Sequence, residues 1–106
     1  MQLALQQFRV NFFKVMSHPL RLQILELICE GAKSVNELQS CLNGEGSMVS
    51  QQLSALRAKH LVSGIKEGNR VVYSIQNPLI HDLLIMTKEI FNNQIKHVIH
   101  VLEPQA

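Results

Sequence analysis

Residues 34–57 read SVNELQSCLNGEGSMVSQQLSALR, a pattern typical of two short helices joined by a tight turn. Ser34 and Glu37 form a capping box, because the serine oxygen can accept from the amide three residues on while the glutamate reaches back. The helix that begins there should end near Asn43-Gly44, where asparagine and glycine favour a stop. The stretch therefore opens with a well-defined short helix.

The second helix of this stretch is predicted to begin at a serine cap, Ser47, and to reach about Leu61. Its apolar side chains recur at three- and four-residue steps, which predicts a buried stripe formed by Val49, Leu53 and Leu56. Two helices joined by a glycine-containing turn form a helix–turn–helix, whose second helix suits the major groove of DNA.

Two more helices are predicted before this unit. The spacing of Leu5, Phe8, Phe12 and Val15 predicts a helix over residues 3–16. Ser17-His18-Pro19 interrupts it, because the residue before a proline avoids helical geometry while the proline suits the start of a new helix. That helix should run to Gly31 with a buried stripe made of Leu20, Ile24, Leu27 and Ile28.

The apolar period changes after the helix–turn–helix. Residues 62–75 are rich in β-formers on either side of the turn sequence Glu67-Gly68-Asn69, which predicts a two-stranded hairpin. Asn77-Pro78 restarts a helix with two apolar stripes, so this helix needs two partners. The stripes are Leu79, Leu83, Met86 and Ile90, and Ile80, Leu84, Phe91, Ile95, Val98 and Leu102. Residues 103–106 are expected to fray.

The composition bounds the kind of protein. A chain of 106 residues is expected to form one domain, 1–106. Its hydrophobic content of 46%, with only 17% charged residues, exceeds what so small a domain needs. We expect the surplus to lie in a subunit interface. No signal peptide and no long apolar run is found, and Cys29 and Cys41 are too few for a secreted disulfide scaffold, so a cytoplasmic protein without membrane partners is expected.

Polar and basic side chains gather on the second helix of the helix–turn–helix and on the hairpin. Residues 47–61 contain no carboxylate, and between Ser47 and Val72 the sole acid is Glu67. Hydroxyl and amide groups can pair with base edges, and cations around a hairpin turn can contact phosphates or a minor groove. Met48 is expected either to touch a thymine methyl or to pack. The expected DNA contacts are Ser47, Met48, Ser50, Gln51, Gln52, Ser54, Arg57, Lys66, Asn69 and Arg70.

Taken together, these motifs resemble the ArsR/SmtB family of transcriptional repressors over residues 13–78. The residues that carry the resemblance are 16–25 (MSHPLRLQIL), 34–38 (SVNEL), 49–57 (VSQQLSALR) and 67–75 (EGNRVVYSI). The resemblance implies a prokaryotic, mainly α winged helix–turn–helix with a small β-hairpin, dimerised through its N- and C-terminal helices. It also implies that Ser47, Ser50 and Gln51 face the bases of double-stranded operator DNA and that residues 66–70 form the wing.

The metal sites of that family are not matched in this sequence. Its thiolate positions correspond to Ser34 and Asn36, and its zinc positions to Asn77, Leu79 and a partner near Ile90, so no cofactor is expected. What remains is His97 and His100, one turn apart, with His81 earlier in the helix. These histidines would either meet across an antiparallel dimer and bind zinc or nickel, or simply be solvated near the helix end. The three candidates are His81, His97 and His100.

The two cysteines leave a second alternative open. Cys29 near the end of the second helix and Cys41 near the end of the third would either approach and oxidise to a disulfide or act as small hydrophobic side chains.

Three functions are compared at this point. The leading one is a homodimeric DNA-binding repressor, of which a metal- or redox-responsive version is a variant, with the inducer undetermined. The second is a winged-helix module that binds protein and no nucleic acid. An enzyme is not expected, since no nucleophile with a base, phosphate loop or paired carboxylates can be assembled.

Overall fold

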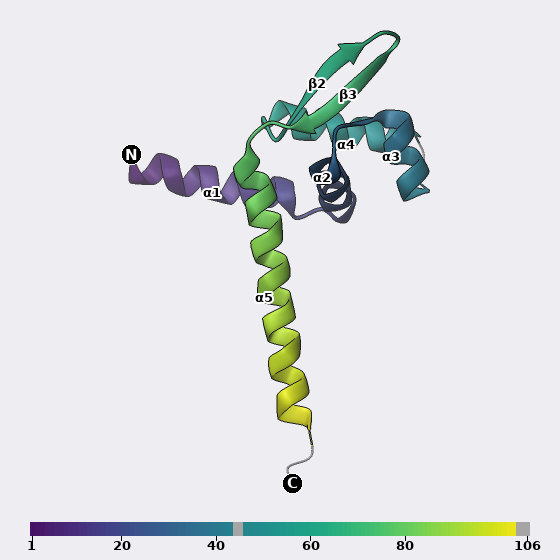
Figure 1. Cartoon of the computed structure of the whole chain (residues 1–106). Helices are drawn as coiled ribbons and strands as arrows, with labels where there is room; N and C mark the ends of the chain where they lie inside the picture. The colour runs from purple at the N-terminus through teal and green to yellow at the C-terminus, as the bar shows by residue number, and fades with distance from the viewer. Residues whose placement is uncertain (44–45, 104–106) are drawn as a thin grey trace.

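The computed structural model describes residues 1–43 and 46–103, which form five helices and one small antiparallel sheet (Figure 1). The helices and the hairpin follow the predicted order. The elements are α1 (Gln2–Met16), α2 (Pro19–Glu30), β1 (Lys33–Ser34), α3 (Val35–Leu42), α4 (Gly46–Ala58), β2 (Val62–Glu67), β3 (Arg70–Ile75) and α5 (Pro78–Leu102).

Side-chain caps fix the starts of three helices. The capping box of α3 is confirmed, with Ser34 accepting from the Glu37 amide and the Glu37 carboxylate accepting from the Ser34 amide. Pro19 occupies the first turn of α2, and the side chain of His18 accepts from the Arg21 amide. Asn77 caps α5 in the same way. Short local signals therefore set these boundaries.

Two predicted details of α4 are wrong. The helix begins at Gly46, so Ser47 lies inside its first turn and is not its cap. It also ends at Ala58 and not near Leu61, because His60 adopts a left-handed φ of 62° that no α-helix continues. Of the predicted stop of α3, Asn43 is the C-cap and Gly44 lies outside the described residues, as do residues 104–106 of the predicted tail.

The end of α4 has the hydrogen bonds of a Schellman motif. The amide of Leu61 donates to the carbonyl of Leu56 and the amide of His60 donates to the carbonyl of Arg57, both at 3.0 Å. Leu56 and Leu61 are both buried, which supplies the apolar contact that accompanies this motif. A histidine thus occupies the position where glycine is usual.

The sheet has one strand more than the sequence predicted. Its order is β1-β3-β2, and β1 pairs Lys33 with Tyr73 and Ser34 with Val72. A strand of two residues is too short to show an alternating pattern, which is why it escaped prediction. In β2, Gly64 faces Tyr73, where an added Cβ would lie 3.1 Å from the ring. Glycine here leaves room for the tyrosine.

The core joins α2, α3, α4 and β2. Leu25 is fully buried although it lay outside the predicted stripe of α2, whereas Leu20 and Leu27 are only half-buried, so that stripe is rotated from its predicted position. The predicted stripe of α4 is confirmed. The fully buried large side chains are Ile24, Leu25, Leu38, Val49, Leu53, Leu56 and Val62.

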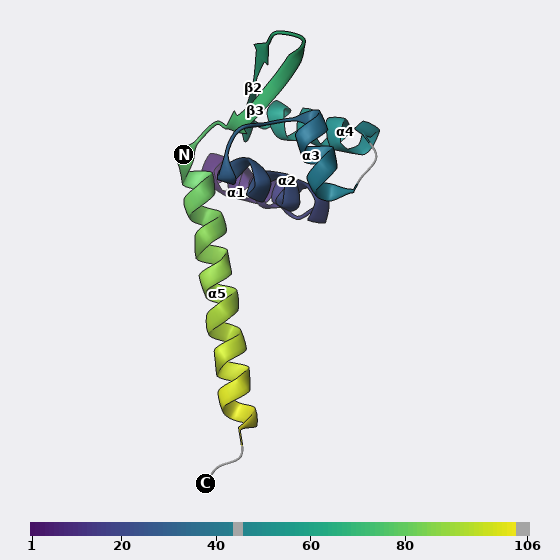
Figure 2. The same cartoon turned by 45° about the vertical axis from the view of Figure 1, so that its right-hand side comes forward.

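Helices α1 and α5 extend away from this core (Figures 1 and 2). The radius of gyration is 17.1 Å, where a compact chain of this length has about 13 Å. The accessible surface is 8020 Å², roughly 2,000 Å² above the value for a compact monomer of this mass. Much of the excess is apolar surface on α5, including Met86, Ile90, Phe91, Ile95 and Val98. Among the described residues we find no helix whose length and apolar character would let it cross a membrane.

The left-handed residue at the end of α4 gives a test of the fold. Substitution His60→Val should lower the free energy of unfolding by about 1–2 kcal/mol, because a β-branched residue is strained at this φ. His60→Gly should leave it unchanged or raise it, because glycine adopts this φ without strain. Thermal and urea denaturation of the two variants measures the difference. Equal stabilities would show that His60 is not left-handed in solution.

Candidate nucleic-acid interface

One face of α4 is lined with short polar side chains. Ser47, Ser50, Gln51 and Ser54 recur at three- and four-residue steps and are all exposed. They lie on the side of the helix opposite its buried stripe. We call these four residues the reading face.

The helix that carries the reading face contains no acidic residue. Residues 46–58 contain no Asp or Glu, and Arg57 lies in the last turn of α4. Met48 flanks the face with its side chain 48% exposed. An apolar contact made by Met48 with a binding partner is therefore compatible with the structure, whereas full burial in the core is not.

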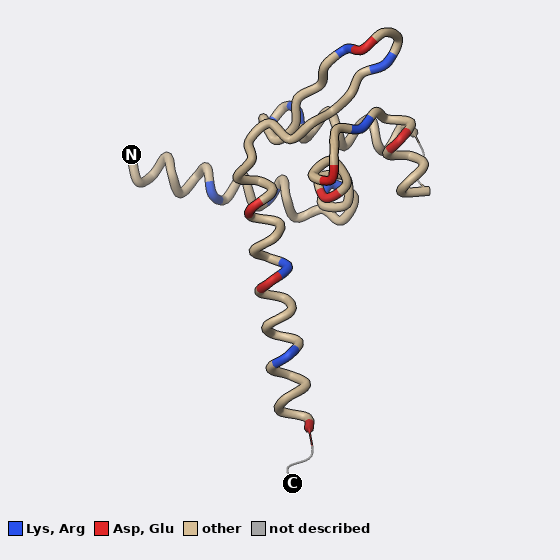
Figure 3. The backbone as a smooth tube through the Cα atoms, viewed as in Figure 1, with Lys and Arg blue, Asp and Glu red and all other residues tan. Residues whose placement is uncertain are grey.

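The hairpin formed by β2 and β3, which we call the wing, carries the second set of predicted contacts. Lys66, Asn69 and Arg70 are exposed near its tip, where Gly68 has a left-handed φ of 61°. Basic segments lie on both strands with an acidic segment between them (Figure 3). In both views of the fold the wing projects from the body on the side of α4 and away from the free end of α5. The wing therefore lies on the same side of the body as α4, the helix that carries the reading face.

Arg70 is held by an acid that the sequence did not connect with it. Its Nη1 lies 3.2 Å from Oε1 of Glu37, and both side chains are about half-exposed. The same carboxylate oxygen accepts from the amide and the hydroxyl of Ser34. The capping box of α3 is therefore also bonded to the wing, at the start of β3.

These contacts lower the pKa of Glu37. The largest cause is the hydrogen bond from the Ser34 amide, followed by that from the Ser34 hydroxyl, and the charge of Arg70 adds to them. Because the folded-state pKa is depressed, the stabilisation is present above the ordinary carboxyl pKa and is lost as the pH falls through the lowered value.

Gln52 differs from the other polar side chains of α4. It is half-buried, and its Oε1 accepts a 2.8 Å hydrogen bond from Nε of Arg21 in α2. Sequence reasoning grouped Gln52 with the residues of the reading face and gave Arg21 no role. The signal in the sequence that separates Gln52 from the reading face is its position around the helix, on the side away from Ser47, Ser50 and Ser54.

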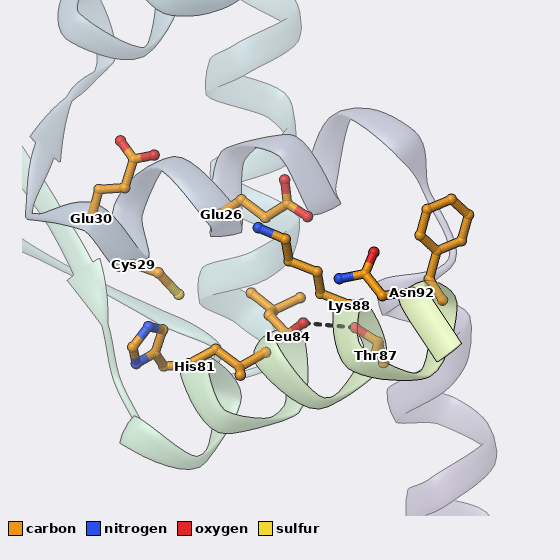
Figure 4. Close-up of a pocket in the computed structure, with 10 residues that line it drawn as sticks. Glu26, Cys29, Glu30, His81, Leu84, Thr87, Lys88 and Asn92 are labelled. Atoms are coloured by element: carbon orange, nitrogen blue, oxygen red, sulfur yellow. Dashed lines mark hydrogen bonds between the residues drawn. The ribbon is translucent and has the colours of Figure 1, made fainter. Parts of the chain in front are cut away.

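The cysteine and histidine candidates lie elsewhere. Cys29 and His81 line a cavity of about 600 Å³ between α2 and α5 (Figure 4). Burial, and then the charge of Glu26, raise the pKa of the Cys29 thiol, which keeps it protonated and weakly nucleophilic. Cys29 and Cys41 are both free thiols. A disulfide between them stays a prediction.

His97 and His100 lie in the last turns of α5 and are exposed, about 24 and 28 Å along the helix from His81. Within the described part of a single chain no three His, Cys, Asp or Glu side chains are grouped to hold a metal ion. The predicted site across a dimer is not tested by one chain. Ser34 and Asn77, which occupy family ligand positions, serve here as helix caps.

Comparison with known proteins agrees with this geometry. Residues 18–63 match the model of the arsR family of bacterial regulatory proteins. The uncharacterized HTH-type transcriptional regulator Rv0081 of Mycobacterium tuberculosis is 39% identical over 100 residues, which cover 93% of this chain and 88% of the relative. Its crystal structure superposes with a TM-score of 0.83 at 36% identity, over 90% of this chain and 96% of that one.

Two further proteins extend the comparison. The homodimeric winged helix-turn-helix DNA-binding domain of Mb0332 from Mycobacterium bovis, a possible ArsR-family regulator, has a TM-score of 0.82 at 25% identity, with 91% of this chain and 89% of that one covered. The transcriptional activator HlyU of Vibrio cholerae is 32% identical over 82 residues, or 77% of this chain and 76% of the relative.

These names describe regulators of transcription and not enzymes, in agreement with the prediction from sequence. With a helix–turn–helix, a wing and relatives of this similarity along nearly its whole length, the chain belongs to the ArsR family and is a winged helix–turn–helix transcriptional regulator.

Proposed function

We propose that this regulator is a homodimeric repressor that binds double-stranded operator DNA. The observation that carries the proposal is the acid-free helix α4 with its exposed hydroxyl and amide groups, together with the cationic wing that projects from the body on the side of α4. The second helix of a helix–turn–helix enters the major groove, where its exposed side chains meet base edges. Ser47, Ser50, Gln51 and Ser54 supply the hydroxyl and amide groups for this contact.

The basic residues would contact the sugar-phosphate backbone. Lys66 and Arg70 on the wing and Arg57 at the end of α4 are exposed cations, and Asn69 adds an amide at the turn. Phosphate contacts fix the register of a protein on the duplex and make affinity fall with salt. The wing would therefore supply affinity, while the reading face supplies sequence preference.

The dimer would form through α1 and α5. The surface excess of roughly 2,000 Å² per chain is of the size that obligate dimers bury. The structurally similar domain of Mb0332 is homodimeric. Two copies would present two α4 helices to successive major grooves about 34 Å apart. We infer that each copy is a single domain spanning 1–106 that acts on DNA in the cytoplasm.

Repression is the mode of action that we propose: where the operator overlaps a promoter, a dimer that spans two grooves would block the access of polymerase. One relative, HlyU, is named an activator. A promoter fused to a reporter gene and carrying the selected binding site distinguishes the two modes, since loss of a repressor raises expression and loss of an activator lowers it.

The proposed DNA binding is tested by selecting duplexes of about 30 base pairs from a random pool, a length that spans two half-sites. The affinity for the selected duplex should fall steeply between low and high salt. A protein-interaction module would show no enrichment of any sequence and no ionic-strength-sensitive attachment to DNA.

The two kinds of contact are separated by a pair of variants. Gln51→Ala should weaken binding to the selected duplex about tenfold with little effect on a scrambled one, because it removes a base contact. Arg70→Ala should weaken both and reduce the salt slope by about two in the dimer, because it removes one phosphate contact per subunit. Equal losses on both duplexes for Gln51→Ala, or an unchanged slope for Arg70→Ala, would contradict these roles.

The ion pair between Glu37 and Arg70 of the wing leads to a gain-of-affinity prediction. Glu37→Gln retains an amide oxygen for the capping box but removes the charge that competes with phosphate for Arg70. Affinity for DNA at low salt should rise about two- to fivefold, the range expected of a half-exposed ion pair. Glu89→Gln on α5 is the charge-matched control. A similar gain in the control would mean that net charge alone is responsible.

The dimer interface is tested by placing a charge on α5. Ile95→Glu puts a carboxylate in an apolar stripe and should produce a monomer with at least a tenfold loss of DNA affinity, because one subunit has half the contacts. Asn93→Glu changes an exposed polar residue of the same helix by the same charge. Analytical ultracentrifugation of both variants should show a monomer and a dimer, respectively. A dimeric Ile95→Glu variant would exclude this stripe from the interface.

A further inference from the structure

The side chain of Arg21, in α2, forms hydrogen bonds to both α1 and α4. It is half-buried near the start of α2. Its Nε donates to Oε1 of Gln52 in α4 at 2.8 Å, and its Nη1 donates to the carbonyl of Val15 in α1 at 3.3 Å. Arg21 thus connects the end of α1 with the middle of α4 through two different groups of one planar guanidinium.

The contact with α1 gives a hydrogen-bond donor to a carbonyl at the end of that helix. The last four carbonyls of an α-helix lack partners within the helix. Here the amide of Ser17 donates to Phe13 and its hydroxyl donates to Lys14, while the amide of His18 donates to Met16. The remaining carbonyl, that of Val15, receives Arg21. Arg21 therefore has a fixed place relative to α1.

The contact with α4 is made on the side away from the reading face. At 3.6 residues per turn, Gln52 lies about 150° around the helix axis from the centre of the reading face and about 70° from the buried stripe. Its half-burial agrees with this position. Gln52 lies on the side of α4 away from the reading face, and its amide oxygen accepts from Arg21, so the side chain is held toward α2 and not toward the reading face.

We infer that Arg21 and Gln52 are a pair of positioning residues that hold α4 in register with the end of α1, and that Gln52 contacts no base. Since α1 is one of the two proposed dimerisation helices, the pair links the dimer interface to the angle at which α4 meets DNA. The inference rests on the proposed DNA binding. The inference divides the uncharged polar residues of α4 into four that contact bases and one, Gln52, that positions the helix.

The first test compares adjacent glutamines. Gln52→Glu keeps an oxygen for Arg21 and turns the hydrogen bond into an ion pair, so affinity for the selected duplex should stay within about threefold and sequence preference should not change. Gln51→Glu places the same charge on the reading face, where phosphates repel it, and should lose at least about tenfold. A comparable loss for Gln52→Glu, or an altered preference, would overturn the inference.

The second test removes the arginine. Arg21→Met keeps the length of the side chain but neither hydrogen bond, and should weaken binding to the selected duplex about tenfold more than binding to a scrambled one, with an unchanged salt slope. If Arg21 served only to stabilise the fold, the substitution would lower the fraction of folded protein and so weaken binding to both duplexes by the same factor. Circular dichroism measures that folded fraction. A salt slope reduced by about two would show that Arg21 itself contacts phosphate, and would overturn its assignment.

A stability cycle tests the pair without DNA. Arg21→Met, Gln52→Met and the double variant should be non-additive in urea denaturation, because the two side chains share one hydrogen bond. Additive effects would refute the pair even if the protein binds DNA as proposed. If wild-type protein binds no duplex but the cycle is non-additive, the proposed function fails and the structural link between α1 and α4 stands.

Discussion

Helices α1 and α5 carry apolar surface that one copy of the chain leaves in water, and the remaining structure is organised around this constraint. Side chains such as Phe8 and Phe91 are 61% and 60% exposed, while the core between α2, α3 and α4 is closed. In the proposed dimer, the driving force for burying this surface acts on α1 and α5, the helices that would set the distance between subunits. Hydrophobic burial in that dimer would fix the spacing of the two α4 helices.

A structural acid lies among the basic residues of the proposed DNA-binding side. Glu37 completes the capping box of α3 and also pairs with Arg70 of the wing. A carboxylate near a phosphate backbone weakens binding, but this one begins a helix of the helix–turn–helix and holds the wing to it. The capping positions Ser34 and Asn77 similarly correspond to metal-ligand positions in the family that the sequence resembles. In this chain the same sites contribute to local stability through hydrogen bonds to backbone amides.

The features predicted from sequence are those that depend on neighbours within a few residues. The box Ser34–Glu37, Pro19 and the turn at Gly68 specify helices and a hairpin by local chemistry, and they were found where expected. The bonds Arg21–Gln52 and Arg70–Glu37 join residues 31 and 33 positions apart, so no local pattern contains them. The DNA-contact assignments of the reading face and the wing remain predictions.

The chemistry of the reading face explains why positioning matters in this protein. Serine and glutamine are short side chains without charge, so they reach base edges only when the helix axis lies close to the groove floor and at one angle. Long arginines would tolerate a displaced helix, whereas a hydroxyl one ångström too far makes no hydrogen bond. A reading face built from short groups therefore requires a rigid support behind it. The planar guanidinium of Arg21, which donates one hydrogen bond to α1 and one to α4, is suited to give that support.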